Sequence, residues 1–141
     1  RRRISRNFIR TSLYPMDTGF IFLQRKDMSM AVQWEYADGT LTVWLSGELD
    51  HHTARPLREQ VDAAIERAVP RWLKLDFHGV TFMDSSGVGL VMGRYRLMKL
   101  LGGELRVVGA SARVERMMRL AGLERLDIWE KEGGEQNEAD Q

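Results

Sequence analysis

Phe82-Met83-Asp84-Ser85-Ser86-Gly87-Val88-Gly89 is the stretch that decides the fold, because it joins an apolar strand to a helix. Ser85 stands where the N–H groups of the coming helix are unpaired and the helix dipole is positive. A phosphate added to this hydroxyl would find hydrogen-bond donors there. Ser, Asp and Gly are also ordinary capping residues, so a capped helix with no further role is the alternative interpretation.

The residues around this stretch show alternating and helical periodicities. Apolar residues alternate with polar ones over 32–36 and 41–45, and Asp38-Gly39 between them is a strong tight-turn dipeptide. Thr53 and Ser111 are placed to cap helices. The predicted elements are strands over 32–36 and 41–45, a helix over 53–69, a strand over 73–77 followed by a bend at Gly79 and the apolar stretch 80–83, a helix over 86–101, a strand over 105–107, a helix over 111–121 and a short strand over 126–128.

The helix predicted over 86–101 contains several glycines. Gly87, Gly89 and Gly93 each cost roughly 1 kcal/mol relative to alanine in a helix interior, so something must offset this cost. Close approach of another backbone is the expected reason. The core-facing stripe of this helix is expected to consist of Val88, Val91, Met92, Tyr95 and Met98.

The element order predicts a single α/β domain with a mixed β-sheet and crossover helices. The 141 residues, 43% hydrophobic and 29% charged, suit one compact domain with a core of its own. Ligands and partners of such sheets tend to meet the protein beyond the carboxyl ends of the strands. Asp84 and Ser85 follow directly on one such strand end.

The charge of the chain is distributed unevenly. Residues 1–27 carry seven Lys or Arg and two Asp or Glu, whereas residues 28–141 carry 14 basic and 18 acidic residues. A domain with an acidic body is unsuited to nucleic acid, which favours a basic patch on the fold itself. We expect residues 1–27 to be an extraneous or disordered extension, with a functional basic arm as the alternative. The domain is expected over 29–130, followed by a disordered acidic tail over 131–141.

Several other classes of protein are disfavoured. There is no cysteine, which excludes disulfides and thiolate chemistry. No apolar run approaches the roughly 18 residues of a membrane span, and a signal-peptide core is lacking, so a cytoplasmic location is expected.

Catalytic, metal and cofactor sites are also disfavoured. The residues Met83-Asp84-Ser85-Ser86-Gly87 lack the first glycine of a serine-hydrolase elbow, and the only histidines are His51, His52 and His78. His51 and His52 are neighbours and lack the i, i+4 spacing of a helical metal site. The glycines of the serine stretch lack the spacing and the lysine of a phosphate-binding loop. We therefore expect no catalytic residue, no metal and no cofactor.

Four blocks together resemble one known family. Gly47-Glu48-Leu49-Asp50-His51-His52-Thr53-Ala54, the stretch 82–89, Gly93-Arg94-Tyr95 and Gly102-Gly103-Glu104 are similar, in order and spacing, to STAS-domain anti-sigma factor antagonists of the sporulation type. The similarity runs over about residues 29–130. Residues 1–27 have no counterpart in that family.

The resemblance implies a partner-switching cycle. An unphosphorylated antagonist of this kind binds an anti-sigma factor that is also a serine kinase, and so releases the sporulation sigma factor. Phosphorylation of the first serine, here Ser85, inactivates the antagonist, and a serine phosphatase reverses the modification. The residues that the resemblance places on the partner-binding surface are Asp50, His51, His52, Thr53, Asp84, Ser85, Ser86 and Gly87.

Three alternatives to a sporulation antagonist remain open at this point. A general-stress anti-sigma antagonist is the near neighbour within the same class of regulatory binding modules. A nucleotide-sensing STAS module, with weak nucleotide binding, is the second alternative, and a small hydrolase is the third. Binding assays against the two kinds of anti-sigma kinase, nucleotide titration and turnover of a generic ester would discriminate among them.

Overall fold

The fold is a mixed six-stranded sheet with helices packed against it. In this computed structural model, the described residues are 5–9, 18–25 and 28–130. The strand order is β1-β2-β3-β4-β5-β6, with antiparallel pairing from β1 to β4 and parallel pairing from β4 to β6. The elements are β1 (Ser5–Ile9), β2 (Thr18–Arg25), β3 (Met28–Ala37), β4 (Thr40–Leu49), α1 (Ala54–Ala68), β5 (Trp72–Met83), α2 (Ser85–Leu100), β6 (Glu104–Val108), α3 (Ala112–Leu120) and the 3₁₀ helix η1 (Leu123–Arg125).

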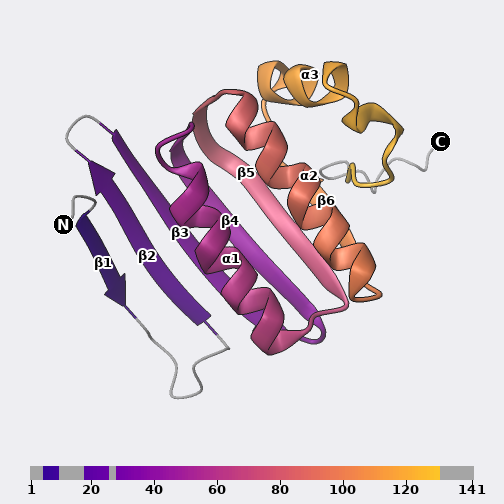
Figure 1. Cartoon of the computed structure of the whole chain (residues 1–141), viewed down its shortest axis with the longest axis horizontal. Helices are drawn as coiled ribbons and strands as arrows, with labels where there is room; N and C mark the ends of the chain where they lie inside the picture. The colour runs from indigo at the N-terminus through magenta and orange to yellow at the C-terminus, as the bar shows by residue number, and fades with distance from the viewer. Residues whose placement is uncertain (1–4, 10–17, 26–27, 131–141) are drawn as a thin grey trace.

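The two crossover helices lie on one face of the sheet. Figure 1 shows α1 and α2 side by side in front of the strands, with α3 beyond the upper end of β5 and β6. The buried residues of β4 alternate along the strand, and Leu41, Val43 and Leu45 are all at most 2% exposed. They pack with the inner faces of α1 and α2 in a single hydrophobic cluster. The prediction of an α/β domain with a mixed sheet and crossover helices is therefore confirmed.

The predicted hairpin is present as β3 and β4. Their register pairs Ala37 with Thr40 across the turn, and Asp38 and Gly39 both adopt positive φ angles of 53° and 79°. Two successive residues with positive φ make a type I′ turn, whose twist matches that of the paired strands. Local turn chemistry and alternation together explain why this hairpin could be predicted.

The N-terminal residues differ from the expectation of a disordered extension. Residues 5–9 and 18–25 form β1 and β2, which continue the sheet beyond β3. Gly19 lies against the indole ring of Trp34, which leaves no room for a Cβ at this position. The sequence interpretation missed these strands because it set residues 1–27 aside as a basic extension, although β2 ends at Arg25 and its partner β3 begins at Met28. The predicted acidic tail, 131–141, lies outside the described residues.

The short strand predicted over 126–128 does not form. Leu126 and Ile128 follow the short helix η1 and do not form a strand, although Val107 and Trp129 make an isolated parallel bridge. The N–H of Val107 donates to the carbonyl of Ile128 at 2.6 Å, and Ile128 is fully buried. The apolar alternation was therefore a sign of burial, and the segment was too short to establish a ladder.

The buried face of α2 is rotated relative to the predicted stripe. Val91 and Met98 are buried as expected, but Val88, Met92 and Tyr95 are only partly buried. Gly87, Leu90 and Arg94 occupy the remaining inward positions. The periodicity rule missed them because it counts only apolar side chains, and glycine and arginine do not score as core residues.

Candidate functional site

The candidate site lies where two neighbouring parallel strands end. Leu49 at the end of β4 is paired with Met83 at the end of β5. The N–H of Asp84 donates to the carbonyl of Leu49 at 3.2 Å, which fastens the start of α2 to the preceding strand. The loop 50–53 and the start of α2 therefore meet at one edge of the sheet, as parallel pairing requires.

Ser85 is the first residue of α2, and its side chain is exposed. Asp84 is the N-cap, with an extended backbone and a carboxylate oxygen that accepts from the N–H of Ser86 at 2.8 Å. The N–H of Gly87 donates to the backbone carbonyl of Asp84 at 2.9 Å. The sequence placed unpaired donors here, but Asp84 already occupies two of them. A phosphate on Ser85 would accordingly stand beside a carboxylate.

Asp50 and Thr53 hold the loop together from inside. The Asp50 carboxylate accepts from the N–H groups of His52 and Thr53 at 2.8 and 3.2 Å. The Thr53 hydroxyl donates to the carbonyl of Glu48 at 2.8 Å and accepts from the N–H of Asp50 at 3.0 Å. Thr53 occupies the N-cap position of α1 without the predicted side-chain cap bond. Both residues are buried and act by positioning their neighbours.

The two histidines lie at the surface of the same loop. The Nδ1 atom of His51 is 3.8 Å from the carboxylate of Asp84, and the His51 side chain is 70% exposed. The His51 and His52 rings lie 3.9 Å apart between centroids. His51 therefore joins the loop after β4 to the cap of α2. His51 and Ser85 are the exposed residues of the predicted surface, and His52, Asp84 and Ser86 are partly exposed.

Gly87 is buried and has a steric role. A Cβ at this position would overlap the side chain of Met83 and would lie 3.2 Å from a methyl carbon of Leu49. Gly87 thus allows α2 to begin close to the ends of β4 and β5. The expected close approach is correct for Gly87, whereas nothing lies within 4 Å of a Cβ at Gly89 or Gly93.

Phe82 is a surface residue that the sequence interpretation did not assign to the site. Its side chain is 49% exposed, although the flanking residues Val80 and Met83 are buried. Phe82 is paired with Glu48 on β4, next to the loop that carries the histidines. An exposed aromatic beside a polar site is typical of a protein interface. The signal available for this exposed side chain was the break in the alternation of polar and apolar residues at Thr81 and Phe82.

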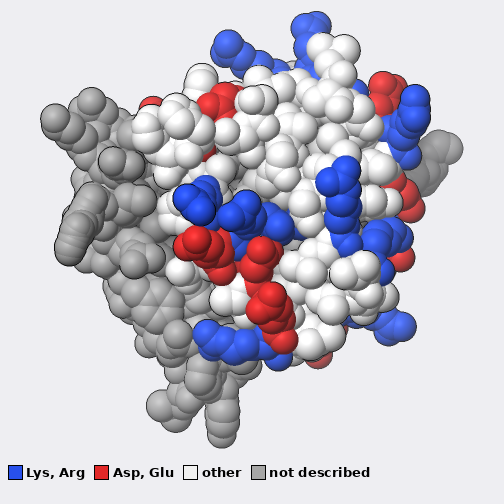
Figure 2. All heavy atoms as spheres, viewed as in Figure 1, with Lys and Arg blue, Asp and Glu red and all other residues white. Residues whose placement is uncertain are grey.

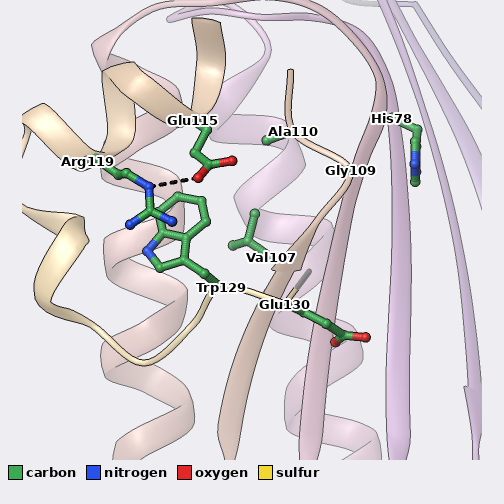
Figure 3. Close-up of a pocket in the computed structure, with 8 residues that line it drawn as sticks. All are labelled: His78, Val107, Gly109, Ala110, Glu115, Arg119, Trp129 and Glu130. Atoms are coloured by element: carbon green, nitrogen blue, oxygen red, sulfur yellow. Dashed lines mark hydrogen bonds and ion pairs between the residues drawn. The ribbon is translucent and has the colours of Figure 1, made fainter. Parts of the chain in front are cut away.

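A cavity lies elsewhere in the fold. It has a volume of about 610 Å³ and lies between the end of β6, α3 and the segment 129–130. Figure 3 shows the Arg119 guanidinium against the Trp129 indole, 4.3 Å from the ring centroid, with Glu115 bonded to Arg119 at 2.8 Å. The two charged groups of this trio, those of Glu115 and Arg119, are partners of each other. None of the predicted site residues lines this cavity.

The described part of the chain holds neither a candidate metal cluster nor a candidate membrane-spanning helix. No three His, Asp or Glu side chains among the described residues are grouped so as to hold a metal ion. Over the same ranges, no helix combines the length and the apolar character that crossing a bilayer would require.

The fold and the site together identify the class of protein. A model of the STAS domain family matches residues 31–133. The chain therefore belongs to the STAS domain family, as its sequence blocks indicated.

The relatives within this family are anti-sigma factor antagonists. The chain is 42% identical over 96 residues to the anti-sigma F factor antagonist of Paenibacillus polymyxa. The aligned residues make up 68% of this chain and 82% of that protein. It is 32% identical over 111 residues to the anti-sigma-B factor antagonist of Bacillus subtilis. This alignment covers 77% of this chain and 100% of that protein. The structure of the unphosphorylated anti-sigma factor antagonist SpoIIAA superposes with a TM-score of 0.64 and 31% identity, covering 74% of this chain and 90% of that one.

Proposed function

We propose that this chain is an anti-sigma factor antagonist that binds an anti-sigma factor serine kinase and is inactivated by phosphorylation of Ser85. Its role is regulatory and non-enzymatic, and a serine phosphatase restores the active form. The observation that carries the proposal is the exposed Ser85 hydroxyl at the first position of α2, beside the Asp84 carboxylate. One similar protein, SpoIIAA, has also been solved in a phosphorylated form, with 30% identity and a TM-score of 0.60. Kinase and ATP must share a compartment with the chain, so we place it in the cytoplasm.

Charge repulsion explains how one phosphate could switch binding. A phosphoserine carries about −1.5 to −2 charges and three acceptor oxygens. Asp84 is already negative and occupies the nearest N–H groups, so the phosphate gains little from the helix start. In a partner interface the two like charges would be desolvated together, which disfavours the complex. The helix and its core contacts need not move for this to occur.

The partner is of the sporulation type in our proposal. The identity to an anti-sigma F factor antagonist is 42%, against 32% for an anti-sigma-B factor antagonist. A general-stress antagonist is the second candidate, because the latter protein is matched over its full length. Parallel binding assays against anti-sigma kinases of the two types would separate the candidates, with tighter binding expected for the sporulation kinase.

The first test is phosphorylation by that kinase. Wild type and Ser85→Ala are incubated with the kinase, ATP and magnesium, and intact mass and peptide mapping follow. A single phosphate on Ser85, absent in the variant, is the expected result. Ser86→Ala is the matched control, because it removes the adjacent hydroxyl and leaves Ser85 in place. Phosphate on Ser86, or none with a kinase active on its own substrate, would refute the assignment.

The second test concerns affinity. Ser85→Ala should bind the kinase like wild type, and Ser85→Asp should bind at least about tenfold more weakly, a difference of about 1.4 kcal/mol. Isothermal calorimetry measures both affinities, and thermal unfolding checks that both variants are folded. Equal affinities for the two variants would remove the charge argument.

A further inference from the structure

A groove between α1 and α2 opens next to the candidate site. It has a volume of about 390 Å³, and the nine described residues that line it include three arginines and no carboxylate. Arg55 and Arg58 project from the exposed side of α1, and Ser86 belongs to the first turn of α2. Figure 2 shows basic side chains gathered in the middle of this helical face, with acidic side chains on one side of them.

The buried arginine of this groove is incompletely satisfied. Arg94 is 7% exposed, and its Nε atom lies 2.8 Å from a carboxylate oxygen of Asp62 on α1. Its Nη1 atom is buried and has no hydrogen-bond partner. A guanidinium has five N–H donors, and a buried donor without an acceptor is costly. Arg94 therefore offers an unused donor at a groove whose lining residues include no carboxylate.

Two of the residues that α2 contributes to the groove wall are glycines. Gly89 and Gly93 lie one helical turn apart, and both line the groove. Open space surrounds the position of a Cβ at each of them, so no contact within the described chain requires glycine. Glycine is nevertheless a poor helix former. Close approach of a group from outside the chain gives a reason for both residues.

We propose that this groove receives a carboxylate side chain of the anti-sigma kinase, with Arg94 and Arg58 as its donors. The inference rests on the function proposed above and adds the chemistry of the contact. A carboxylate suits a guanidinium because the two planar groups can pair through parallel hydrogen bonds. The occupant approaches over Gly89 and Gly93, where a flat backbone surface replaces side chains. His51 and Ser86 of the predicted surface themselves line the groove, so one partner can cover both regions.

The test compares charge variants at Arg58, which is exposed and is not a member of the Arg94–Asp62 ion pair, although its charge acts on both of these groups. Affinity for the kinase is measured by calorimetry at two salt concentrations. Arg58→Glu should weaken binding at least about tenfold, and Arg58→Lys should weaken it less than about threefold. Arg113→Glu on the exposed side of α3 is the matched control, since it makes the same change of net charge away from the groove. It should bind like wild type.

A steric variant tests the same groove without a change of charge. Gly89→Ala places a methyl group in the open space of the groove and should weaken kinase binding at least about fivefold in a protein that remains folded. Unchanged affinity for both Arg58→Glu and Gly89→Ala, with wild type bound, would overturn the groove proposal alone. Failure of wild type to bind the kinase would overturn the proposed function and the groove together. Titration with inorganic phosphate completes the test. Binding that Arg58→Glu abolishes, with kinase affinity unchanged, would assign the groove to a phosphate group and overturn the proposal.

Discussion

Gly87 and Gly89 lie two positions apart in α2, and their surroundings are opposite. A Cβ at Gly87 would overlap Met83, whereas a Cβ at Gly89 would meet open space. The first glycine is needed by the fold, because α2 begins against the ends of two strands. The second is unexplained by the fold and lines the groove beside the site. The same residue type therefore serves packing at one position and the surface at the other.

Alanine substitution should separate these two roles. Gly87→Ala is expected to lower the free energy of unfolding by about 1–3 kcal/mol, because the added methyl group overpacks a buried contact. Gly89→Ala is expected to raise it by about 0.5–1 kcal/mol through better helix propensity. Urea unfolding of the unphosphorylated chain measures both changes. Destabilisation by Gly89→Ala would mean that the helix approaches another part of the chain at this position.

At the level of the elements, α1 and α2 are joined by the Asp62–Arg94 pair. Burial raises the pKa of Asp62 above its ordinary value, and the nearby charge of Arg94 lowers it less strongly. Burial likewise lowers the pKa of Arg94, although Asp62 opposes this shift. The loss of hydration at this pair thus exceeds the mutual attraction of its charges. Such a pair determines how the helices are placed more than it stabilises them.

The raised pKa of Asp62 predicts a pH dependence of stability. The folded state holds the proton of Asp62 more firmly than the unfolded chain does, so this group favours folding most below the ordinary aspartate pKa of about 3.9. That contribution is lost as the pH rises through the raised pKa. The Asp62→Asn variant cannot ionise at this position. As the pH rises from about 4 towards neutrality, the free energy of unfolding of this variant should therefore increase relative to that of wild type.

The measurement is chemical unfolding of wild type and Asp62→Asn at a series of pH values. Glu59→Gln on the same helix is the control, because Glu59 is exposed and 3.9 Å from Arg55 in a surface pair. Surface pairs of this kind contribute about 1 kcal/mol or less. A difference between wild type and Asp62→Asn that stays constant with pH would contradict the direction of the Asp62 shift.

At the level of the whole molecule, the sheet continues beyond the region shared with the family. The family model begins at residue 31, whereas β1 and β2 precede it. Among the residues whose side chains the structure describes, the hydrophobic cluster runs from Met30 to Ile128. β2 pairs with β3 along its full length, from Thr18 opposite Glu35 to Arg25 opposite Met28. β1 and β2 therefore extend the sheet from the edge that β3 presents.

Deletion of residues 1–27 should leave folding and kinase binding intact, because the core cluster and the candidate site remain. The edge of β3 would become unpaired, and exposed strand edges favour association. We therefore expect a far-ultraviolet circular dichroism spectrum of a folded α/β protein, with greater self-association in light scattering. The Trp34 ring loses its contact with Gly19, so its fluorescence should shift to longer wavelength. Unfolding of the truncated chain, or loss of kinase binding, would show that β1 and β2 are integral to the domain.

Sequence alone predicted the features that depend on neighbours along the chain. The β3–β4 hairpin follows from alternation and from Asp38-Gly39, and the start of α2 follows from the Asp84 cap. The motif order also identified the family, because its blocks have characteristic spacings. These features depend on local backbone preferences and periodic burial, which are determined by residues close together along the chain.

Only the tertiary structure decided the features that depend on contacts between remote segments. It placed Leu126 and Ile128 after η1 without a strand, and divided the predicted site into buried Asp50 and Thr53 and exposed Ser85. It also brought Arg94 of α2 to Asp62 of α1 and left a groove beside Ser86. The physical reason is that burial and charge pairing depend on distances set by packing of the whole chain, and sequence separation carries little information about those distances.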